Sequence, residues 1–232
     1  MEKGDPLRPR IIYDICRLIL LTWFRAFHGA VFRGRDNLPR QGPLILCPNH
    51  ISYYDPPLVG IGVPFAMRYM AWDALFGVPL LGSFIRSLGA FPVKLKTADK
   101  SAIERTLKVL RSRATVTIFP EGGRSFTGDL MPFEVGAFRL AVQTGATIVP
   151  VSILGMFEAW APIETLPTLF RPVIVKYHHP IVVPANIPRT EVKTTVDNLS
   201  NEVRRVIIRR QQAFERLRKM KSTGGVWGIV RK

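Results

Sequence analysis

Apolar residues recur at two different spacings along the 232-residue chain. Near its start, residues 10–31 carry apolar side chains three or four positions apart, which is the spacing of an amphipathic helix. Four polar residues interrupt this segment: Asp14, Arg17, Arg25 and His28. A membrane-spanning helix needs about 20 mostly apolar residues, so we predict a helix that does not cross a membrane. Its wide apolar face suits either core packing or a membrane surface, and we favour the membrane surface.

Short apolar runs follow, and they have the length and composition of β-strands. These runs cover residues 44–47, 65–71, 89–93, 115–119, 148–154 and 173–177. Helical spacing appears between some of them, over residues 101–111 and 133–143. Because strands and helices alternate, the pattern predicts an α/β fold with a mostly parallel central sheet flanked by helices.

A long, strongly basic helix is predicted over residues 191–221. From Val203 to the last residue of the sequence, the only acidic side chain is Glu215. Such a charge run is either a solvated face or a contact with anionic headgroups, and we favour the headgroups. The chain is thus divided into an N-terminal amphipathic helix (residues 1–32), an α/β domain (residues 33–190) and a basic C-terminal helix and tail (residues 191–232).

The overall charge narrows the classes of partner. The sequence has 33 Lys and Arg against 17 Asp and Glu, a net charge of +16. Such a field attracts nucleic acid, an anionic membrane surface or a phosphorylated substrate. The sequence has no zinc-type spacing, no RNA-recognition aromatic motif and no basic zipper. We therefore expect no nucleic-acid partner.

The cysteines and a histidine pair give little sign of metal or redox chemistry. Cys16 and Cys47 are far apart and lack metal-type spacing, which indicates a reducing compartment and no disulfide framework. His178 and His179 are adjacent, so on a strand their side chains would point to opposite faces. We expect both histidines to be structural and predict no metal site.

A histidine and an aspartate follow directly on the strand predicted over residues 44–47. In open α/β sheets, ligands bind beyond the carboxyl ends of the strands. Asp55 can fold back to accept a hydrogen bond from one ring nitrogen of His50, so that the other nitrogen can take a proton. Asn49 and Ser52 are expected to support this loop by hydrogen bonds. The spacing is common by chance, so the pair predicts a general base only together with other evidence.

A second loop, residues 119–125 with the sequence FPEGGRS, follows another predicted strand. A proline and two glycines, Gly122 and Gly123, predict a tight turn with exposed backbone N–H groups. Arg124 adds a planar cation that suits bidentate binding of phosphate. Glu121 either orients a substrate or caps the turn.

Together, the NHxxxxD and FPEGxRS blocks resemble the glycerolipid acyltransferase family, specifically the 1-acylglycerol-3-phosphate acyltransferases. The two blocks lie about 70 residues apart, as in that family. Two further stretches agree in order and spacing: GAFPV at residues 89–93 and IVPVS at residues 148–152. The resemblance extends from about residue 33 to residue 180. It implies that residues 33–190 form the catalytic domain of an O-acyltransferase of phospholipid biosynthesis.

The resemblance implies a one-step transfer without a covalent acyl-enzyme. His50, oriented by Asp55, would deprotonate the free hydroxyl of lysophosphatidic acid, which attacks the thioester of acyl-CoA or acyl-carrier protein. Backbone N–H groups near Gly122 and Gly123 would either stabilise the oxyanion or hold phosphate. No cofactor is implied. The expected location is the cytoplasmic face of a membrane, as a peripheral or monotopic protein on an anionic surface.

The sequence departs from the family at three positions that are usually basic, which are here Leu95, Trp72 and Glu134. The first is the usual place of an Arg that holds the substrate phosphate. Lys94 and Lys96 flank it and would share one face of a strand, so they could supply the charge as point charges. Another lysophospholipid or a lyso-aminolipid therefore remains an alternative acceptor. A thioester hydrolase that uses the same His–Asp pair is a less favoured alternative.

Overall fold

A computed structural model describes residues 10–94 and 99–223, and Leu95 and Lys96 lie outside them. It contains a seven-stranded sheet in the order β1-β7-β6-β2-β5-β3-β4. The strands are β1 (Val31–Arg33), β2 (Leu44–Pro48), β3 (Arg68–Trp72), β4 (Ala90–Val93), β5 (Thr115–Thr117), β6 (Thr147–Leu154) and β7 (Ile174–Tyr177). All neighbouring strands are parallel except β6 and β7, which are antiparallel. The predicted α/β fold with a mostly parallel sheet is therefore confirmed.

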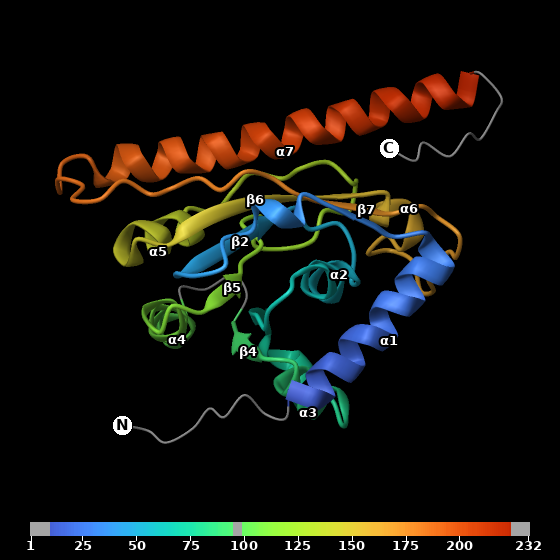
Figure 1. The fold of residues 1–232 in the computed structure, drawn as a ribbon, viewed down its shortest axis with the longest axis horizontal. Coiled ribbons are helices and arrows are strands. Elements are labelled where there is room, and N and C mark those ends of the chain that lie inside the picture. Colours follow the sequence, from blue (N-terminus) through green and yellow to red (C-terminus); the bar gives the residue numbers. More distant parts are fainter. Residues whose placement is uncertain (1–9, 95–98, 224–232) are drawn as a thin grey trace.

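Helices cover both faces of this sheet (Figure 1). They are α1 (Arg10–His28), α2 (Asp55–Gly62), α3 (Leu81–Ser87), α4 (Lys100–Arg111), α5 (Gly136–Thr144), α6 (Met156–Ala159) and α7 (Val192–Thr223). Two short 3-10 helices, η1 (Arg35–Asn37) and η2 (Asp73–Gly77), complete the described elements. In Figure 1, α7 lies across the upper face of the sheet, and α1 and α2 lie below it.

The two faces of β2 separate two hydrophobic cores. Leu44 and Leu46 belong to the core beneath α1 and α2, and Ile45 and Cys47 belong to the core beneath α4, α5 and α7. All four side chains are buried. Because successive side chains on a strand point to opposite faces, β2 must be apolar at every position, as its sequence shows.

Helix α1 has two apolar faces with different environments. Leu20, Leu21 and Phe24 pack on the core, and Phe24 is fully buried. The Arg17 Nε atom donates a hydrogen bond to the Ile61 carbonyl at 3.1 Å, which ties α1 to α2. The opposite face is exposed and carries Ile15, Leu18, Ile19 and Trp23. Among the described residues, no helix has the length and apolarity that crossing a membrane requires.

The two halves of the basic helix α7 have different environments. Its first half buries four apolar side chains against the sheet: Val196, Leu199, Val203 and Ile207. Its later turns expose Leu217 and Met220, and Arg218 forms an ion pair with Glu158 of α6. The first half of α7 is therefore part of the domain core.

Candidate active site

The two candidate loops begin at neighbouring strands of the sheet. His50 follows β2 and Glu121 follows β5, and these strands pair in parallel with Ile45 opposite Val116. The carboxyl ends of parallel neighbours lie at the same edge of a sheet. Residues 71 positions apart in the sequence are thereby brought into direct contact.

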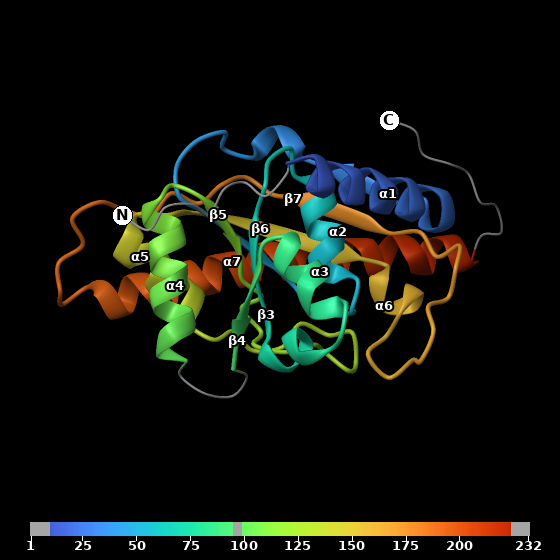
Figure 2. The ribbon, with the colours of Figure 1, turned by 90° about the horizontal axis from the view of Figure 1, so that it is seen from below.

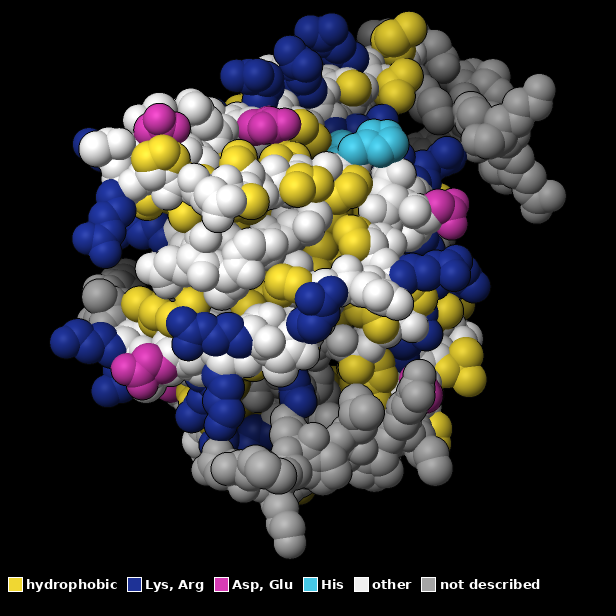
Figure 3. All heavy atoms as spheres, turned by 60° about the vertical axis from the view of Figure 1, so that its left-hand side comes forward, with side chains coloured by type: hydrophobic (Ala, Val, Ile, Leu, Met, Phe, Trp, Pro, Cys, Tyr) yellow, Lys and Arg dark blue, Asp and Glu magenta, His cyan; other side chains and the backbone are white. Residues whose placement is uncertain are grey.

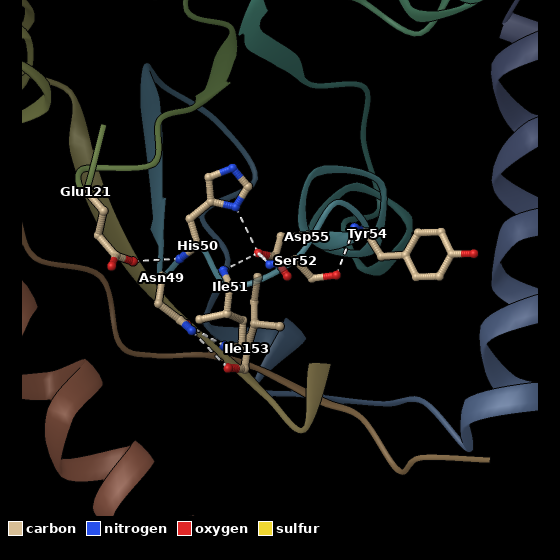
Figure 4. Close-up of polar contacts among 8 residues, drawn as sticks. All are labelled: Asn49, His50, Ile51, Ser52, Tyr54, Asp55, Glu121 and Ile153. Atoms are coloured by element: carbon tan, nitrogen blue, oxygen red, sulfur yellow. Dashed lines mark hydrogen bonds and ion pairs between the residues drawn. The ribbon is translucent and has the colours of Figure 1, made fainter. Parts of the chain in front are cut away.

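His50 and Asp55 are hydrogen-bonded as the sequence predicts (Figure 4). The His50 Nδ1 atom lies 2.8 Å from Asp55 Oδ2. The Asp55 side chain is fully buried, whereas 17% of the His50 side chain is exposed. Figure 4 shows the second ring nitrogen, Nε2, on the side of the ring away from Asp55. The geometry therefore leaves Nε2 as the nitrogen that can exchange a proton with a substrate.

Local backbone contacts hold Asp55 in this position. Its Oδ2 atom also accepts hydrogen bonds from the backbone N–H groups of Ile51 at 2.6 Å and Ser52 at 2.7 Å. Asp55 is the first residue of α2, and prolines occupy the next two positions, where the fixed φ of proline suits the first turn of a helix. The Ser52 Oγ atom accepts a hydrogen bond from the Tyr54 N–H at 3.3 Å. The turn between His50 and Asp55 is therefore closed by the side chains of Ser52 and Asp55, which accept hydrogen bonds from its own backbone.

Asn49 anchors the other side of the His50 loop. Its Nδ2 atom donates to the Ile153 carbonyl at 3.0 Å, and its Oδ1 atom accepts from the Ile153 N–H at 2.7 Å. Pro48 and Val151 are the last paired residues of the parallel strands β2 and β6. The fully buried Asn49 side chain thus extends the β2–β6 ladder by imitating a backbone, and it fixes where the loop leaves the sheet.

Glu121 connects the two loops. Its Oε1 atom accepts a hydrogen bond from the His50 N–H at 2.6 Å, and its Oε2 atom accepts from the Met131 N–H at 2.8 Å. The Ser125 N–H donates to the His50 carbonyl at 2.8 Å. Both backbone polar groups of His50 are therefore held by the 119–125 loop.

The buried position of Glu121 changes its acidity. Burial raises the pKa of this carboxyl from 4.5 to about 7, although the two backbone N–H donors act in the opposite direction. Desolvation disfavours the charged form of a carboxyl. Near neutral pH, the residue that supports His50 is therefore close to its own titration point.

Aromatic rings complete the site, and sequence reasoning assigned a role to none of them. The ring of Phe119 stacks on His50 with centroids 4.0 Å apart and an interplanar angle of 28°. The Arg124 guanidinium lies over the ring of Tyr53, 3.6 Å from its centroid, and Tyr53 contacts Trp160. Tyr53 lies within the NHxxxxD block and Phe119 opens FPEGGRS, so position in a motif was the only signal in the sequence.

The remaining predicted site residues differ in their relation to this centre. Gly122 adopts φ +67° in the turn that follows Phe119, and its N–H donates to the Phe119 carbonyl at 3.2 Å. Gly123 faces open space. Lys94 is exposed after β4, and its N–H donates to Asp99 Oδ2 at 3.0 Å. Lys96 lies outside the described residues, so the structure places only one of the two predicted lysines.

The histidine pair at the end of β7 is not part of this centre. The His178 Nε2 atom lies 2.9 Å from Ser152 Oγ. Burial, assisted by nearby cations such as Lys176 and Arg210, lowers the pKa of His178 to about 4, so the ring is neutral at physiological pH. Burial also raises the pKa of the Cys47 thiol. Within the described ranges, no group of three His, Cys, Asp or Glu could hold a metal ion.

The fold and the interlocked loops match a known family. Residues 30–154, more than half of the chain, match the family model described as Acyltransferase. The chain therefore belongs to the acyltransferase family.

Particular relatives share its sequence and fold. The chain is 30% identical over 155 residues to the chloroplastic 1-acyl-sn-glycerol-3-phosphate acyltransferase LPAT1 of Arabidopsis thaliana, covering 65% of this chain and 43% of that protein. It is 30% identical over 145 residues to the 1-acyl-sn-glycerol-3-phosphate acyltransferase of Bacillus subtilis, covering 62% and 72%. The crystal structure of PlsC, the 1-acyl-sn-glycerophosphate acyltransferase from Thermotoga maritima, matches with a TM-score of 0.66 and 25% identity over 96% of this chain and 86% of that one. The chain thus spans less than half of the plant relative and most of the two bacterial ones.

Proposed function

We propose that this chain transfers a fatty acyl group from acyl-CoA or acyl-carrier protein to the free hydroxyl of lysophosphatidic acid, giving phosphatidic acid. The observation that carries the proposal is the His50–Asp55 pair, whose loop is bonded to the 119–125 loop through both backbone groups of His50. The names of the relatives, which are 1-acyl-sn-glycerol-3-phosphate acyltransferases, support this substrate.

In the proposed reaction, His50 acts as the general base. Its Nε2 atom takes the proton of the acceptor hydroxyl while the hydroxyl oxygen attacks the carbonyl carbon of the thioester. The carbon–sulfur bond then breaks, and the imidazolium returns the proton to the leaving thiolate. Asp55, bonded to Nδ1, holds the ring in the tautomer that leaves Nε2 free to accept, and it stabilises the imidazolium. A general base typically contributes about 10²–10⁴ in rate, so substrate positioning and oxyanion stabilisation must supply the rest.

Arg124 is the proposed ligand of the acceptor phosphate. A guanidinium binds phosphate through two parallel hydrogen bonds, and the Tyr53 ring beneath it limits the directions that the fork can take. The backbone N–H group of Gly123 would hold either the phosphate or the oxyanion, whereas that of Gly122 donates to the Phe119 carbonyl. Lys94 and Lys96 are proposed to supply the positive charge that an Arg at position 95 provides in the family.

The exposed face of α1 is the proposed contact with the membrane. Ile15, Leu18, Ile19 and Trp23 are spaced as one stripe of a helix and are all exposed. An apolar stripe of this kind binds at the boundary between headgroups and acyl chains. The charge of +16 favours an anionic surface, and we propose that the chain acts at the cytoplasmic face of a membrane.

A panel of acceptors tests the proposal. The protein is incubated with a labelled acyl-CoA or acyl-carrier protein and with lysophosphatidic acid, other lysophospholipids or a lyso-aminolipid, and the lipid product is identified by its mass. We expect phosphatidic acid with the wild type and no product with His50→Ala. Transfer only to a different lyso-lipid would replace the proposed acceptor. Release of free fatty acid without any acyl lipid would instead show a thioester hydrolase.

A further inference from the structure

Three arginines line a cavity at the free edge of the sheet, away from the candidate active site. The cavity has a volume of about 490 Å³. Arg68 comes from the start of β3, Arg86 from α3 and Arg105 from α4, and none of the described lining residues is acidic. The lining is completed by Ser83, Gly89, Ala90, Phe91 and Val109.

A glycine turn beside this cavity brings the chain against the Arg68 side chain. Gly89 has φ +90°, and a Cβ atom at this position would lie 2.7 Å from the Met67 carbonyl oxygen and 3.4 Å from two atoms of the Arg68 side chain. Any larger residue would therefore collide with the Met67 carbonyl and strain the turn before β4. Arg86 is held from another side, because its guanidinium lies over the Phe76 ring, 4.6 Å from the centroid.

The chemistry of the cavity fits a phosphate group. Guanidinium groups bind phosphate oxygens through paired, charge-assisted hydrogen bonds. Three of them from three separate elements can surround one phosphate from different directions. A volume of about 490 Å³ holds a phosphate and the glycerol attached to it, which is more than a simple ion requires.

The other face of α3 is apolar and exposed. Ser83 and Arg86, three positions apart, line the cavity, whereas Leu81 and Phe84 lie on the opposite side of the helix and are 38% and 46% exposed. Leu80, just before α3, is 89% exposed. It also adopts φ +63°, an unfavourable conformation for a branched side chain. The fold thus holds apolar side chains in solvent beside an arginine-lined cavity.

The cavity is separate from the candidate active site. Arg68 is paired with Val116, which lies opposite Ile45 near the start of β2, whereas His50 follows the end of that strand. Figures 1 and 2 show α3 on the side of the sheet away from α7, the side on which α1 also lies.

We propose that this cavity binds the phosphate of an anionic phospholipid in the bilayer, while Leu80, Leu81 and Phe84 insert among the acyl chains. The apolar residues beside the cavity select a lipid headgroup over a free phosphate, because an interfacial helix buries its apolar face and places its basic groups at headgroup level. This second membrane contact is independent of the acyl transfer proposed above.

Vesicle binding of the full chain tests this site. Vesicles of phosphatidylcholine with and without 20 mole per cent of phosphatidylglycerol are sedimented with the wild type and with the double variant Arg86→Gln, Arg105→Gln. We expect the variant to bind the anionic vesicles about tenfold more weakly, since each basic group near an anionic surface contributes to the attraction. Binding to pure phosphatidylcholine should change little.

A matched control is needed because lysines and arginines also gather on other faces, such as that of α4, α5 and the start of α7 (Figure 3). Arg139 and Arg189 line a second cavity of about 510 Å³. The double variant Arg139→Gln, Arg189→Gln loses the same charge and should weaken binding less than about twofold. Equal losses in the two double variants would show a general effect of charge and overturn the proposal.

Two further arms keep the proposal testable. Leu81→Gln with Phe84→Gln should weaken binding to both kinds of vesicle, and unchanged binding would overturn the insertion of α3.

Inorganic phosphate at constant ionic strength should not compete with the vesicles, and complete displacement would identify a site for free phosphate instead. If the double variant Arg86→Gln, Arg105→Gln unfolds at a lower temperature than the wild type, the double variant Arg86→Lys, Arg105→Lys is tested in its place. We expect it to bind the anionic vesicles more weakly than the wild type, because lysine lacks the paired hydrogen bonds of a guanidinium. Binding equal to that of the wild type would overturn phosphate recognition by the arginines.

Measurements of acyl transfer distinguish this lipid-binding site from the proposed active site. The arginine variants should acylate a short-chain, water-soluble lysophosphatidic acid at the wild-type rate. His50→Ala should bind vesicles as the wild type does. Lost activity with retained vesicle binding would therefore concern the active site alone.

Discussion

Two regions of the molecule differ in the environment of their side chains. One is the edge of the sheet that carries His50, and the other is the surface formed by α1 and α3. At the His50 edge, the buried side chains of Asn49 and Glu121 are paired with backbone from distant parts of the chain. On the α1 and α3 surface, large apolar side chains such as Leu18, Leu80 and Phe84 are exposed. Buried polar groups that lose a partner are costly, whereas exposed apolar groups cost little to replace. The two regions should therefore respond differently to substitution.

The largest effect is expected at Asp55. In Asp55→Asn, the acceptor of the Nδ1 proton is lost or reversed, so the ring of His50 no longer presents the right tautomer. We expect kcat to fall about 10²–10⁴-fold while KM stays within about threefold. Steady-state kinetics with a saturating acyl donor measure both values. A change confined to KM would contradict the orienting role of Asp55.

Asn49→Ala should mainly destabilise the fold. The substitution leaves the buried N–H and carbonyl of Ile153 without their side-chain partner. We expect the free energy of unfolding to fall by about 2–4 kcal/mol, since each unpaired buried group costs about 1–3 kcal/mol. Urea unfolding followed by circular dichroism measures it. Asn37→Ala, which removes one side-chain hydrogen bond to the Tyr177 carbonyl, serves as a milder control. An equal fall in the free energy of unfolding for both variants would contradict the anchoring role of Asn49.

Glu121→Gln should affect both catalysis and the pH dependence of stability. A glutamine offers one acceptor and one donor to the two N–H groups that Glu121 now bonds, so the His50 loop should shift and kcat should fall about 10–100-fold. The raised pKa of Glu121 means that the folded protein binds a proton more tightly than the unfolded chain between pH 4.5 and about 7. Its contribution to stability is therefore present below pH 4.5 and decreases as the pH rises toward 7, by up to about 1.4 kcal/mol per pH unit.

Unfolding at a series of pH values compares the wild type with Glu121→Gln, in which this slope should disappear. Glu134→Gln is the control because Glu134 is exposed in the same region. Equal slopes in the wild type and in Glu121→Gln would contradict the raised pKa.

A smaller effect is expected at Arg124. Arg124→Lys keeps the charge but loses the fork and its stacking on Tyr53. We expect KM for the phosphorylated acceptor to rise about tenfold with kcat nearly unchanged. Tyr53→Leu should raise the same KM by a smaller factor, because it removes only the support beneath the guanidinium. If neither variant changes KM, another group binds the phosphate.

The smallest effect on stability is expected on the exposed face of α1. Leu18→Gln with Ile19→Gln should change the free energy of unfolding by less than about 0.5 kcal/mol. Binding to vesicles of phosphatidylcholine should nevertheless fall several-fold, because the apolar stripe provides the proposed contact. Sedimentation and thermal unfolding of the same preparation measure both quantities. Wild-type binding by this variant would exclude α1 as the contact.

Sequence patterns predicted the elements that carry strong periodicity. The strand predicted over residues 148–154 is β6, and the helix predicted over residues 101–111 is α4, each within one residue. Helix α2 was not predicted, since Asp55–Gly62 contains two prolines and two glycines. The helix persists because tertiary contacts outweigh its low propensity: Gly60 lies so close to the Tyr69 hydroxyl that no Cβ would fit.

For the candidate site, the sequence predicted the residues and the local His50–Asp55 contact, but not the contacts between the two loops. A hydrogen bond between His50 and Asp55 follows from local spacing, and the structure contains it. The bonds of Glu121 to His50 and Met131 depend on which strands are neighbours and on their register. Neither the order of the strands in the sheet nor their register is determined by the pattern of apolar residues within one strand. The antiparallel direction of β7 was missed for the same reason.

The order of the strands also bears on how the chain is made. Strand β1 pairs with β7, and β2 pairs with β5 and β6, so β1 and β2 are synthesised well before the strands that pair with them. Such non-local pairings form slowly, whereas α1 needs only local contacts to begin folding. During synthesis, α1 is therefore available before the sheet that later covers its buried face. The exposed stripe of α1, which is the proposed membrane contact, is therefore complete before the strands of the sheet have found their partners.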